Sequence, residues 1–183
     1  MCQRHYLLWM PAHNILYTYI APFLIPAGLS ERVDFILLVF GIAALLGIWI
    51  TGLLVDRYLR ILVLLSLGVF ALTAIMLGFG GKIPPVIYLG IALWGVTFGG
   101  AATLLQTASA DAAGDGADVA QSMVVTAWNL AIAGGGIAGG VLLETSGVSS
   151  FPWVICILLL IGLIVAWQAK KHGFPRSRQD SLR

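Results

Sequence analysis

A few polar side chains interrupt the long apolar stretches of this 183-residue sequence. Imidazole, amide, phenol and indole groups can hydrogen-bond a small organic solute and hold it against aromatic walls. The residues that could line such a cavity are His13, Asn14, Tyr17, Trp94, Gln106, Trp128 and Asn129. Taken singly, each is better explained by hydrogen bonding between packed helices. Asn14 and Tyr17 lie three residues apart and so share a helix face, and this cluster favours a cavity.

His13 is the one histidine well inside an apolar stretch, where its ring could respond to protons. A ring near the end of the stretch, or one hydrogen-bonded to a neighbouring helix, explains the residue at least as well. Because no aspartate or glutamate lies inside the stretches, we expect no proton-binding carboxylate within them.

Patterns that indicate catalysis or cofactor binding are missing. Ser66, Ser122 and His13 form no recognisable nucleophile–base motif. Residues 134–139 fit the GxGxxG pattern of dinucleotide sites, but they lie inside an apolar stretch instead of between a strand and a helix. The two cysteines are far apart and belong to no zinc pattern. We therefore expect no enzyme, no cofactor and no metal site.

Composition identifies the elements that must position the polar residues. Hydrophobic residues make up 60% of the sequence and charged residues 10%, with a mean hydropathy of +0.97. A soluble domain carries about 25% charged residues, so lipid is the expected solvent. A membrane-spanning helix needs about 20 apolar residues. Six stretches qualify, at residues 6–27, 35–55, 61–80, 86–108, 119–143 and 151–169. The sequence thus predicts an all-α membrane protein, with a six-helix transmembrane domain over residues 1–169 and a basic cytoplasmic tail over 170–183.

The basic residues predict the orientation of these helices in the bilayer. Two of them, Arg32 and Lys82, fall on one side of the predicted membrane. Eight fall on the side of the two termini: Arg4, Arg57, Arg60, Lys170, Lys171, Arg176, Arg178 and Arg183. Because lysine and arginine gather on the cytoplasmic side, both termini are expected in the cytoplasm. The expected location is the plasma membrane, here a bacterial inner membrane. The net charge of +2 is too small to indicate a nucleic-acid partner.

Glycines recur at the four-residue spacing that lets helix backbones approach closely in lipid. The pairs are Gly95 with Gly99, Gly135 with Gly139, and Gly136 with Gly140. We expect these pairs to form packing surfaces, which could also slide in a rocking motion.

Residues 52–60 read GLLVDRYLR, which resembles the loop signature GxLxDRxGRK of the major facilitator superfamily. The match keeps Gly52, Asp56, Arg57 and Arg60, and it departs at Leu59, where the family has glycine. Residues 13–24 and 93–107 are similar to the seventh and tenth helices of arabinose- and purine-efflux-type permeases.

The resemblance covers the chain from His13 onward and implies helices seven to twelve of a twelve-helix carrier. It implies efflux of a small organic solute by alternating access, together with a missing N-terminal half of six helices. It also implies that Asp56 attracts a neighbouring helix end while Arg57 and Arg60 form ion pairs that lock one access state. A plain topology-setting turn is the alternative reading of these residues. A non-transporting fragment, or a membrane subunit that pairs with another carrier half, is the alternative function.

Overall fold

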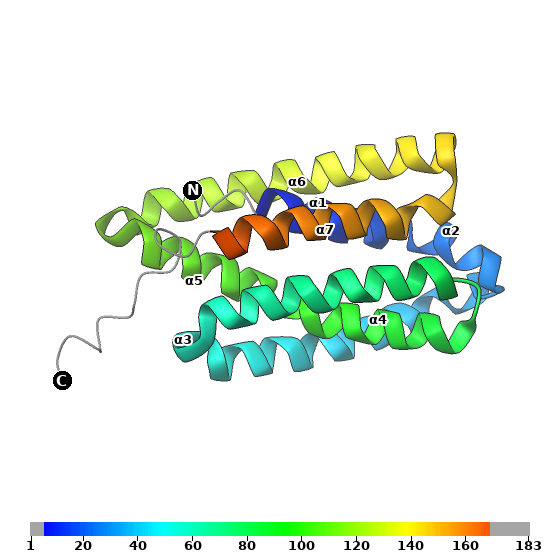
Figure 1. Ribbon diagram of the computed structural model, residues 1–183, viewed down its shortest axis with the longest axis horizontal. Helices are drawn as coiled ribbons and strands as arrows, with labels where there is room; N and C mark the ends of the chain where they lie inside the picture. Colours follow the sequence, from blue (N-terminus) through cyan, green and yellow to red (C-terminus); the bar gives the residue numbers. More distant parts are fainter. Residues whose placement is uncertain (1–5, 169–183) are drawn as a thin grey trace.

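The computed structural model describes residues 6–168, and these form helices and short 3-10 turns with no strand among them. The all-α prediction is therefore confirmed for this part of the chain, and the tail at 170–183 lies outside it. The helices are α1 (Tyr6–Thr18), α2 (Ile20–Leu24), α3 (Val33–Gly80), α4 (Pro84–Gly99), α5 (Ala101–Ala113), α6 (Ala117–Ser146) and α7 (Phe151–Gln168) (Figure 1).

Helix α3 consists of two arms that meet at Tyr58. This residue has non-helical backbone angles (φ −129°, ψ 23°), and the chain folds back there into a helical hairpin (Figure 1). The bend falls within the charged turn that the sequence placed between two stretches. By length and composition, four helical segments of the described chain could cross a membrane: Ser30–Gly80, Pro84–Ala110, Ala117–Ser146 and Val148–Gln168. The first has 51 residues and contains both arms, so it combines two of the predicted spans, and the predicted span at residues 6–27 is not among the four.

The first predicted span is divided into α1 and α2. Tyr19 interrupts the helix with φ −110° and ψ 27°. Pro22 supplies a reason, because it has no N–H to bond the carbonyl of Thr18 four residues earlier. A 3-10 turn then ends at Gly28, whose φ of 70° suits a residue without a Cβ. With 13 residues, α1 alone is shorter than the about 20 needed for a crossing.

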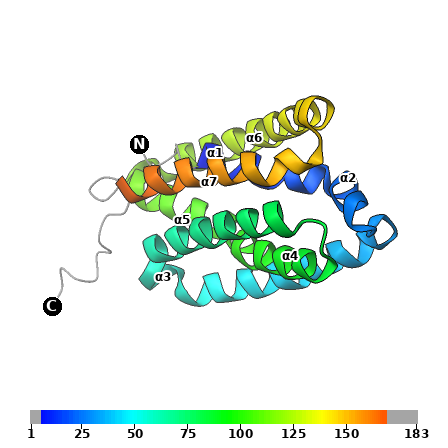
Figure 2. The same ribbon diagram turned by 45° about the vertical axis from the view of Figure 1, so that its right-hand side comes forward.

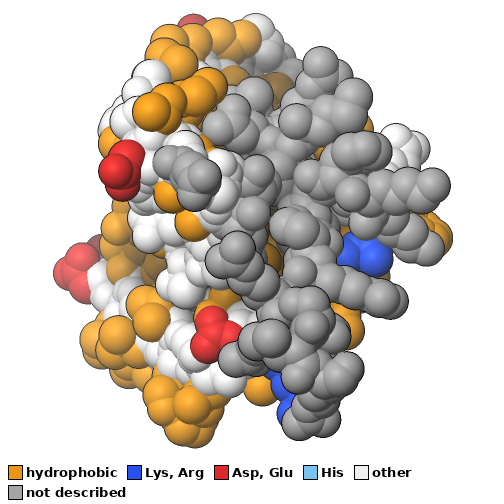
Figure 3. Space-filling model, turned by 90° about the vertical axis from the view of Figure 1, so that its left-hand side faces the viewer, with side chains coloured by type: hydrophobic (Ala, Val, Ile, Leu, Met, Phe, Trp, Pro, Cys, Tyr) orange, Lys and Arg blue, Asp and Glu red, His pale blue; other side chains and the backbone are white. Residues whose placement is uncertain are grey.

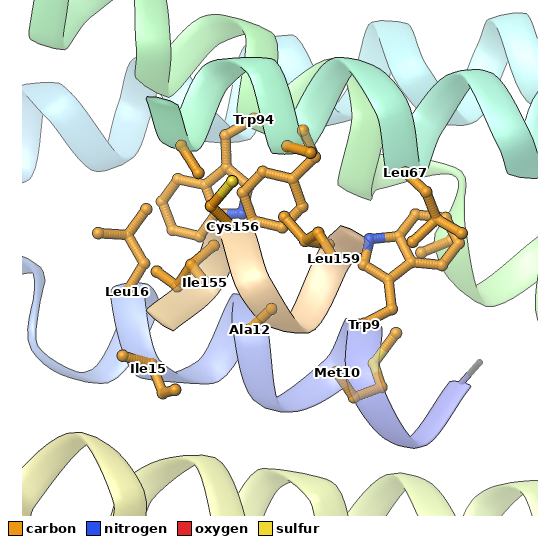
Figure 4. Close-up of a cluster of buried hydrophobic side chains, with 14 of the residues drawn as sticks. Trp9, Met10, Ala12, Ile15, Leu16, Leu67, Trp94, Ile155, Cys156 and Leu159 are labelled. Atoms are coloured by element: carbon orange, nitrogen blue, oxygen red, sulfur yellow. The ribbon is translucent and has the colours of Figure 1, made fainter. Parts of the chain in front are cut away.

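The helices run side by side along the long axis of the molecule. α1, α6 and α7 lie together on one side and α3 and α4 on the other, in both views (Figures 1 and 2). Large side chains from α1, α3, α4 and α7 fill the space between them, among them Trp9, Leu67, Trp94 and Leu159 (Figure 4). Each of these four side chains has 0% exposure.

The outward surface is largely apolar, as lipid requires of the part of a protein that spans it. Exposed large hydrophobic residues follow both arms of α3, for example Phe35, Leu45, Trp49 and Leu72. Seen from the end that holds the Tyr58 bend, a few acidic and basic side chains stand among hydrophobic ones (Figure 3). The charged residues of the described chain lie near helix ends and turns, at residues 31–34, 56–60, 82, 111–118 and 144.

Glycines stand where helices cross. A Cβ added at Gly47 would collide with the backbone carbonyl of Val96, and one added at Gly99 would collide with the backbone of Ala44. The first arm of α3 therefore meets α4 almost backbone to backbone. Such contact maximises dispersion between helices where no hydrophobic effect draws them together.

We expect Gly47→Ala to destabilise the bundle, because the backbone at Val96 cannot yield as a flexible side chain could. The loss should be about 1–3 kcal/mol in the free energy of unfolding, measured by denaturant titration in detergent. Gly41→Ala, on the same arm with nothing within 4 Å of the new methyl group, is the matched control. It should be neutral or slightly stabilising, since alanine favours helix. Equal effects of the two variants would contradict this account.

Candidate functional site

Three of the polar residues singled out in the sequence meet at one hollow between α5 and α6. Gln106 comes from α5, and Trp128 and Asn129 come from α6. The hollow has a volume of about 290 Å³, close to the lower end of the range for small-ligand sites. Ala102 and Val124 contribute to its apolar wall. An amide from each helix and one indole therefore face a common space.

The hydrogen-bonding capacity of this hollow is mostly unused. The side-chain nitrogen of Asn129 donates to the carbonyl of Val125 in its own helix at 2.9 Å, which leaves its side-chain oxygen as an acceptor. The amide of Gln106 is exposed and has no hydrogen-bond partner among residues 6–168. No charged residue lines the hollow. The arrangement suits a neutral solute with hydroxyl groups, which both accept and donate hydrogen bonds.

His13, Tyr17 and Trp94 belong to a different cluster, made of aromatic rings. The imidazole of His13 stacks on Phe98 with centroids 3.5 Å apart and planes within 2°. The ring of Tyr17 also stacks on the His13 ring, with centroids 5.3 Å apart, and the ring of Trp94 lies 5.2 Å from the His13 ring. Phe40 completes the cluster at 4.3 Å from Trp94. His13 and Trp94 are buried, whereas Tyr17 is 46% exposed.

The nitrogen atoms inside this cluster lack partners. Nδ1 of His13 and Nε1 of Trp94 are buried without a hydrogen bond among the described residues. Because burial of an unpaired polar atom costs free energy, the close ring stacking must offset that cost. The geometry makes His13 a packed ring at the junction of α1, α3 and α4. It lies neither at a helix end nor in a hydrogen bond to a neighbouring helix.

Asn14 does not join Tyr17 in a common cavity. Its side-chain nitrogen donates to the carbonyl of Met10 at 2.9 Å, and its Cβ faces Gly135 of α6. Tyr17 instead lies beside Phe40 and Trp94, on α3 and α4. Three residues of helix turn through about 300°, so such a pair is offset by about 60° and can contact different neighbours. A shared helix face did not decide which helix each side chain meets.

The predicted glycines lie at two crossings. Gly95 and Gly99 face the first arm of α3, and a Cβ on Gly95 would be 2.6 Å from the carbonyl oxygen of Phe40. On α6, Gly135 and Gly139 face α1, and the hydroxyl of Tyr19 lies 2.9 Å from the Cβ position of Gly140. Gly136 has open space at its Cβ position, but its carbonyl accepts a hydrogen bond from the Tyr19 hydroxyl at 2.9 Å.

The charged residues of the turn at residues 52–60 lie in different environments. Asp56 is exposed and has no ion pair within the described chain, and Gly52 faces open space. The guanidinium of Arg57 lies 5.6 Å from the ring of Tyr58. Arg60 reaches α7, where its Nη2 donates to the carbonyl of Trp167 at 3.3 Å. A cation at the last turn of a helix satisfies a free carbonyl and opposes the helix dipole.

Sequence reasoning missed Phe40 and Phe98, which hold the His13 ring, and Ala102 and Val124 beside Gln106. These are ordinary apolar residues in apolar helices, so their type carries no signal. Only the ring contacts of α1 with α3 and α4, and the packing of α5 against α6, reveal their contribution.

Comparisons with known proteins identify a family and several relatives that cover most of the chain. A model of the Major Facilitator Superfamily matches residues 7–181. A protein of Mannheimia succiniciproducens named probable sugar efflux transporter is 26% identical over 164 residues, covering 86% of this chain and 40% of that protein. Proteins with the same name from Haemophilus influenzae and Helicobacter pylori are also 26% identical and are covered to 44% and 39% of their length. The chain thus spans about two fifths of the relatives it matches.

We expect Arg60→Gln to loosen the last turn of α7, because the carbonyl of Trp167 loses its cationic donor. The local loss should be about 1 kcal/mol, read as faster hydrogen–deuterium exchange near residues 164–168. Arg57→Gln removes the same charge from the same turn without touching α7, so exchange there should stay as in the unmodified chain. Similar acceleration in both variants would mean that charge alone, and not the hydrogen bond, holds the turn.

Proposed function

Because the chain belongs to the Major Facilitator Superfamily, we propose that it forms the C-terminal, six-helix half of a carrier that exports a small organic solute by alternating access. The main support for a half is the coverage: the chain matches about two fifths of each relative's length, which is somewhat less than one half. The six helices of this proposal are α1 with α2, the two arms of α3, α4 with α5, α6 and α7. Their apolar outer surface suits a multi-pass membrane protein.

The proposed solute is a neutral polyhydroxylated molecule, with sugars as the leading class. The relatives carry sugar efflux in their names. The α5–α6 hollow supports the same class, because Gln106 and Asn129 offer amide groups and no charge lines the space. Trp128 provides an indole face on which the C–H face of a sugar ring can pack. We assign these three residues to solute binding and the His13 cluster to support of α1 against α4.

The turn at residues 52–60 is proposed to act at the boundary with the other half. Asp56 and Arg57 are exposed and form no ion pair within the described chain, so they remain available to a partner. A carboxylate is stabilised at a helix N-terminus, which is the contact we propose in one access state. Eight of the ten basic residues fall on the side of the two termini and two fall on the other side, which supports cytoplasmic termini in a bacterial inner membrane. Reporter enzymes fused at either end should both read cytoplasmic.

Pairing with a second half tests the proposal directly. We expect this chain, reconstituted alone in vesicles, to move radiolabelled sugar no faster than empty vesicles. Joined to the N-terminal half of the Haemophilus influenzae relative, it should restore efflux, because the cavity then has both walls. The relative's own two halves, expressed in the same split form, are the control.

Two outcomes would contradict a half-carrier. One is robust transport by the isolated chain. The other is failure of the mixed halves to transport although they co-purify and the control halves transport. The second outcome would favour a non-transporting membrane subunit that binds a carrier.

Solute protection tests the α5–α6 hollow. In a background with Cys2 and Cys156 replaced by serine and alanine, Gln106→Cys and Asn129→Cys should react with a polar thiol reagent. A transported sugar should slow both reactions severalfold, because the solute occupies the space beside these atoms. Thr126→Cys is the matched control, since Thr126 is exposed on α6 but does not line the hollow. Protection of all three positions, or of none, would contradict the assignment.

A further inference from the structure

A second hollow lies at the end of the bundle opposite the Tyr58 bend. It has a volume of about 270 Å³ and sits where the turn after α3 meets the turn after α6. Both turns lie at the same end as the loop between α2 and α3 (Figure 1). Its inner wall is apolar and buried, with Phe23, Leu77 and Pro152, while Phe79 is 79% exposed at its rim.

Two polar side chains stand at this rim, Lys82 and Ser149. Lys82 supplies the only charge among the lining residues, and its ammonium has no hydrogen bond or ion pair within residues 6–168. The hydroxyl of Ser149 is likewise without a described partner. The acidic residues of this end, Glu31, Asp34 and Glu144, are exposed, do not line the hollow and do not pair with Lys82. Lys82 is therefore the one charged side chain that lines the hollow, and it has no acidic partner among the described residues.

The N-terminus of α7 adds to this positive character. A 3-10 turn at Val148–Ser150 runs directly into α7, and Val148, Ser149 and Pro152 all line the hollow. The N–H groups of Ser150 and Phe151 already donate to the carbonyls of Gly147 and Val148, and Pro152 has no N–H, so the helix dipole is what favours an anion here. The 18-residue helix thus directs the positive end of its dipole to the place where Lys82 stands.

Exposed aromatic rings beside the hollow mark the level of the lipid headgroups. Trp153 is 41% exposed and meets Phe79 edge to face, with centroids 5.1 Å apart. Trp167 is 63% exposed at the other end of the same helix. Tryptophan at both ends of an apolar helix is typical of the two membrane–water interfaces. A buried apolar wall below a free cation at this level matches a molecule with an anionic head and a hydrocarbon tail.

We propose that this hollow binds an anionic phospholipid, with the phosphate at Lys82, Ser149 and the start of α7, and an acyl chain along Phe79 toward Phe23 and Leu77. Lysine binds phosphate as a point charge, and basic pockets between membrane helices bind anionic headgroups. A net negative headgroup is favoured because no acidic residue lines the hollow and none pairs with Lys82 among residues 6–168. The site is separate from the α5–α6 hollow, with which it shares no lining residue.

Lipid retention measured by native mass spectrometry tests the proposal on the whole chain in detergent. Phosphatidylglycerol, phosphatidylcholine and inorganic phosphate are the three probes. We expect the unmodified chain to retain phosphatidylglycerol in preference to phosphatidylcholine. Lys82→Ala should weaken that retention about fivefold, the effect of one basic residue at an anionic surface. Lys82→Arg should keep most of it.

Arg32→Ala is the matched control, because Arg32 is the other cation of this end and does not line the hollow. It should bind phosphatidylglycerol as the unmodified chain does. Equal losses in the Lys82→Ala and Arg32→Ala variants would overturn the proposal in favour of diffuse charge attraction. Equal retention of the two lipids, or complete displacement of lipid by inorganic phosphate, would overturn it as well. Lys82 is exposed, so its variants should keep the unfolding temperature of the unmodified chain, which the same samples can confirm.

Discussion

Close approach of helix backbones is the constraint on which this bundle depends. Between helices in lipid there is no hydrophobic driving force, so association relies on dispersion and on the few hydrogen bonds available. Glycines at Gly47, Gly95 and Gly99 bring α4 against the first arm of α3 until carbonyl groups limit further approach. Gly135 lets α6 approach α1 at Pro11 and Asn14, and Gly139 leaves room for the ring of Tyr19. Each crossing fixes one pair of helices, and the rings of the His13 cluster then connect α1 with α3 and α4.

The lipid solvent also determines which partners the polar side chains hydrogen-bond. Asn14, Thr73, Thr97 and Asn129 each donate to a carbonyl four residues earlier in their own helix, at 2.8–2.9 Å. A polar group satisfied in this way needs neither water nor a neighbouring helix. Groups that remain unsatisfied and accessible are therefore the informative ones. In the α5–α6 hollow these are the amide of Gln106 and the side-chain oxygen of Asn129, which is why we assign solute binding there.

Sequence reasoning reached the all-helical fold, the reversal near Tyr58 and the spacing of the glycines, because each depends on local properties of the chain. Apolar length fixes a helix, a charged turn ends one, and a four-residue spacing places two glycines on one face. The partners of each face depend on tertiary packing and carry no such local signal. Asn14 met Gly135 across a gap of more than 100 residues, and Tyr17 met Trp94, although both side chains lie on nearly the same face of α1. The placement of Gln106 beside Asn129 likewise required the pairing of α5 with α6.

The two ends of the bundle use their few charges in different ways. At the Tyr58 end, Arg60 is committed to the last turn of α7, while Asp56 and Arg57 have no partner in the described chain. The committed residue ties the α3 hairpin to the last turn of α7. At the opposite end, Lys82 lies over a hollow with an apolar wall and no acidic lining residue. A charge kept free beside exposed aromatic rings costs little at the water interface and gains most from an anion held there. In a chain with 10% charged residues, the charges that lack a partner within residues 6–168 therefore indicate where the bundle meets its surroundings.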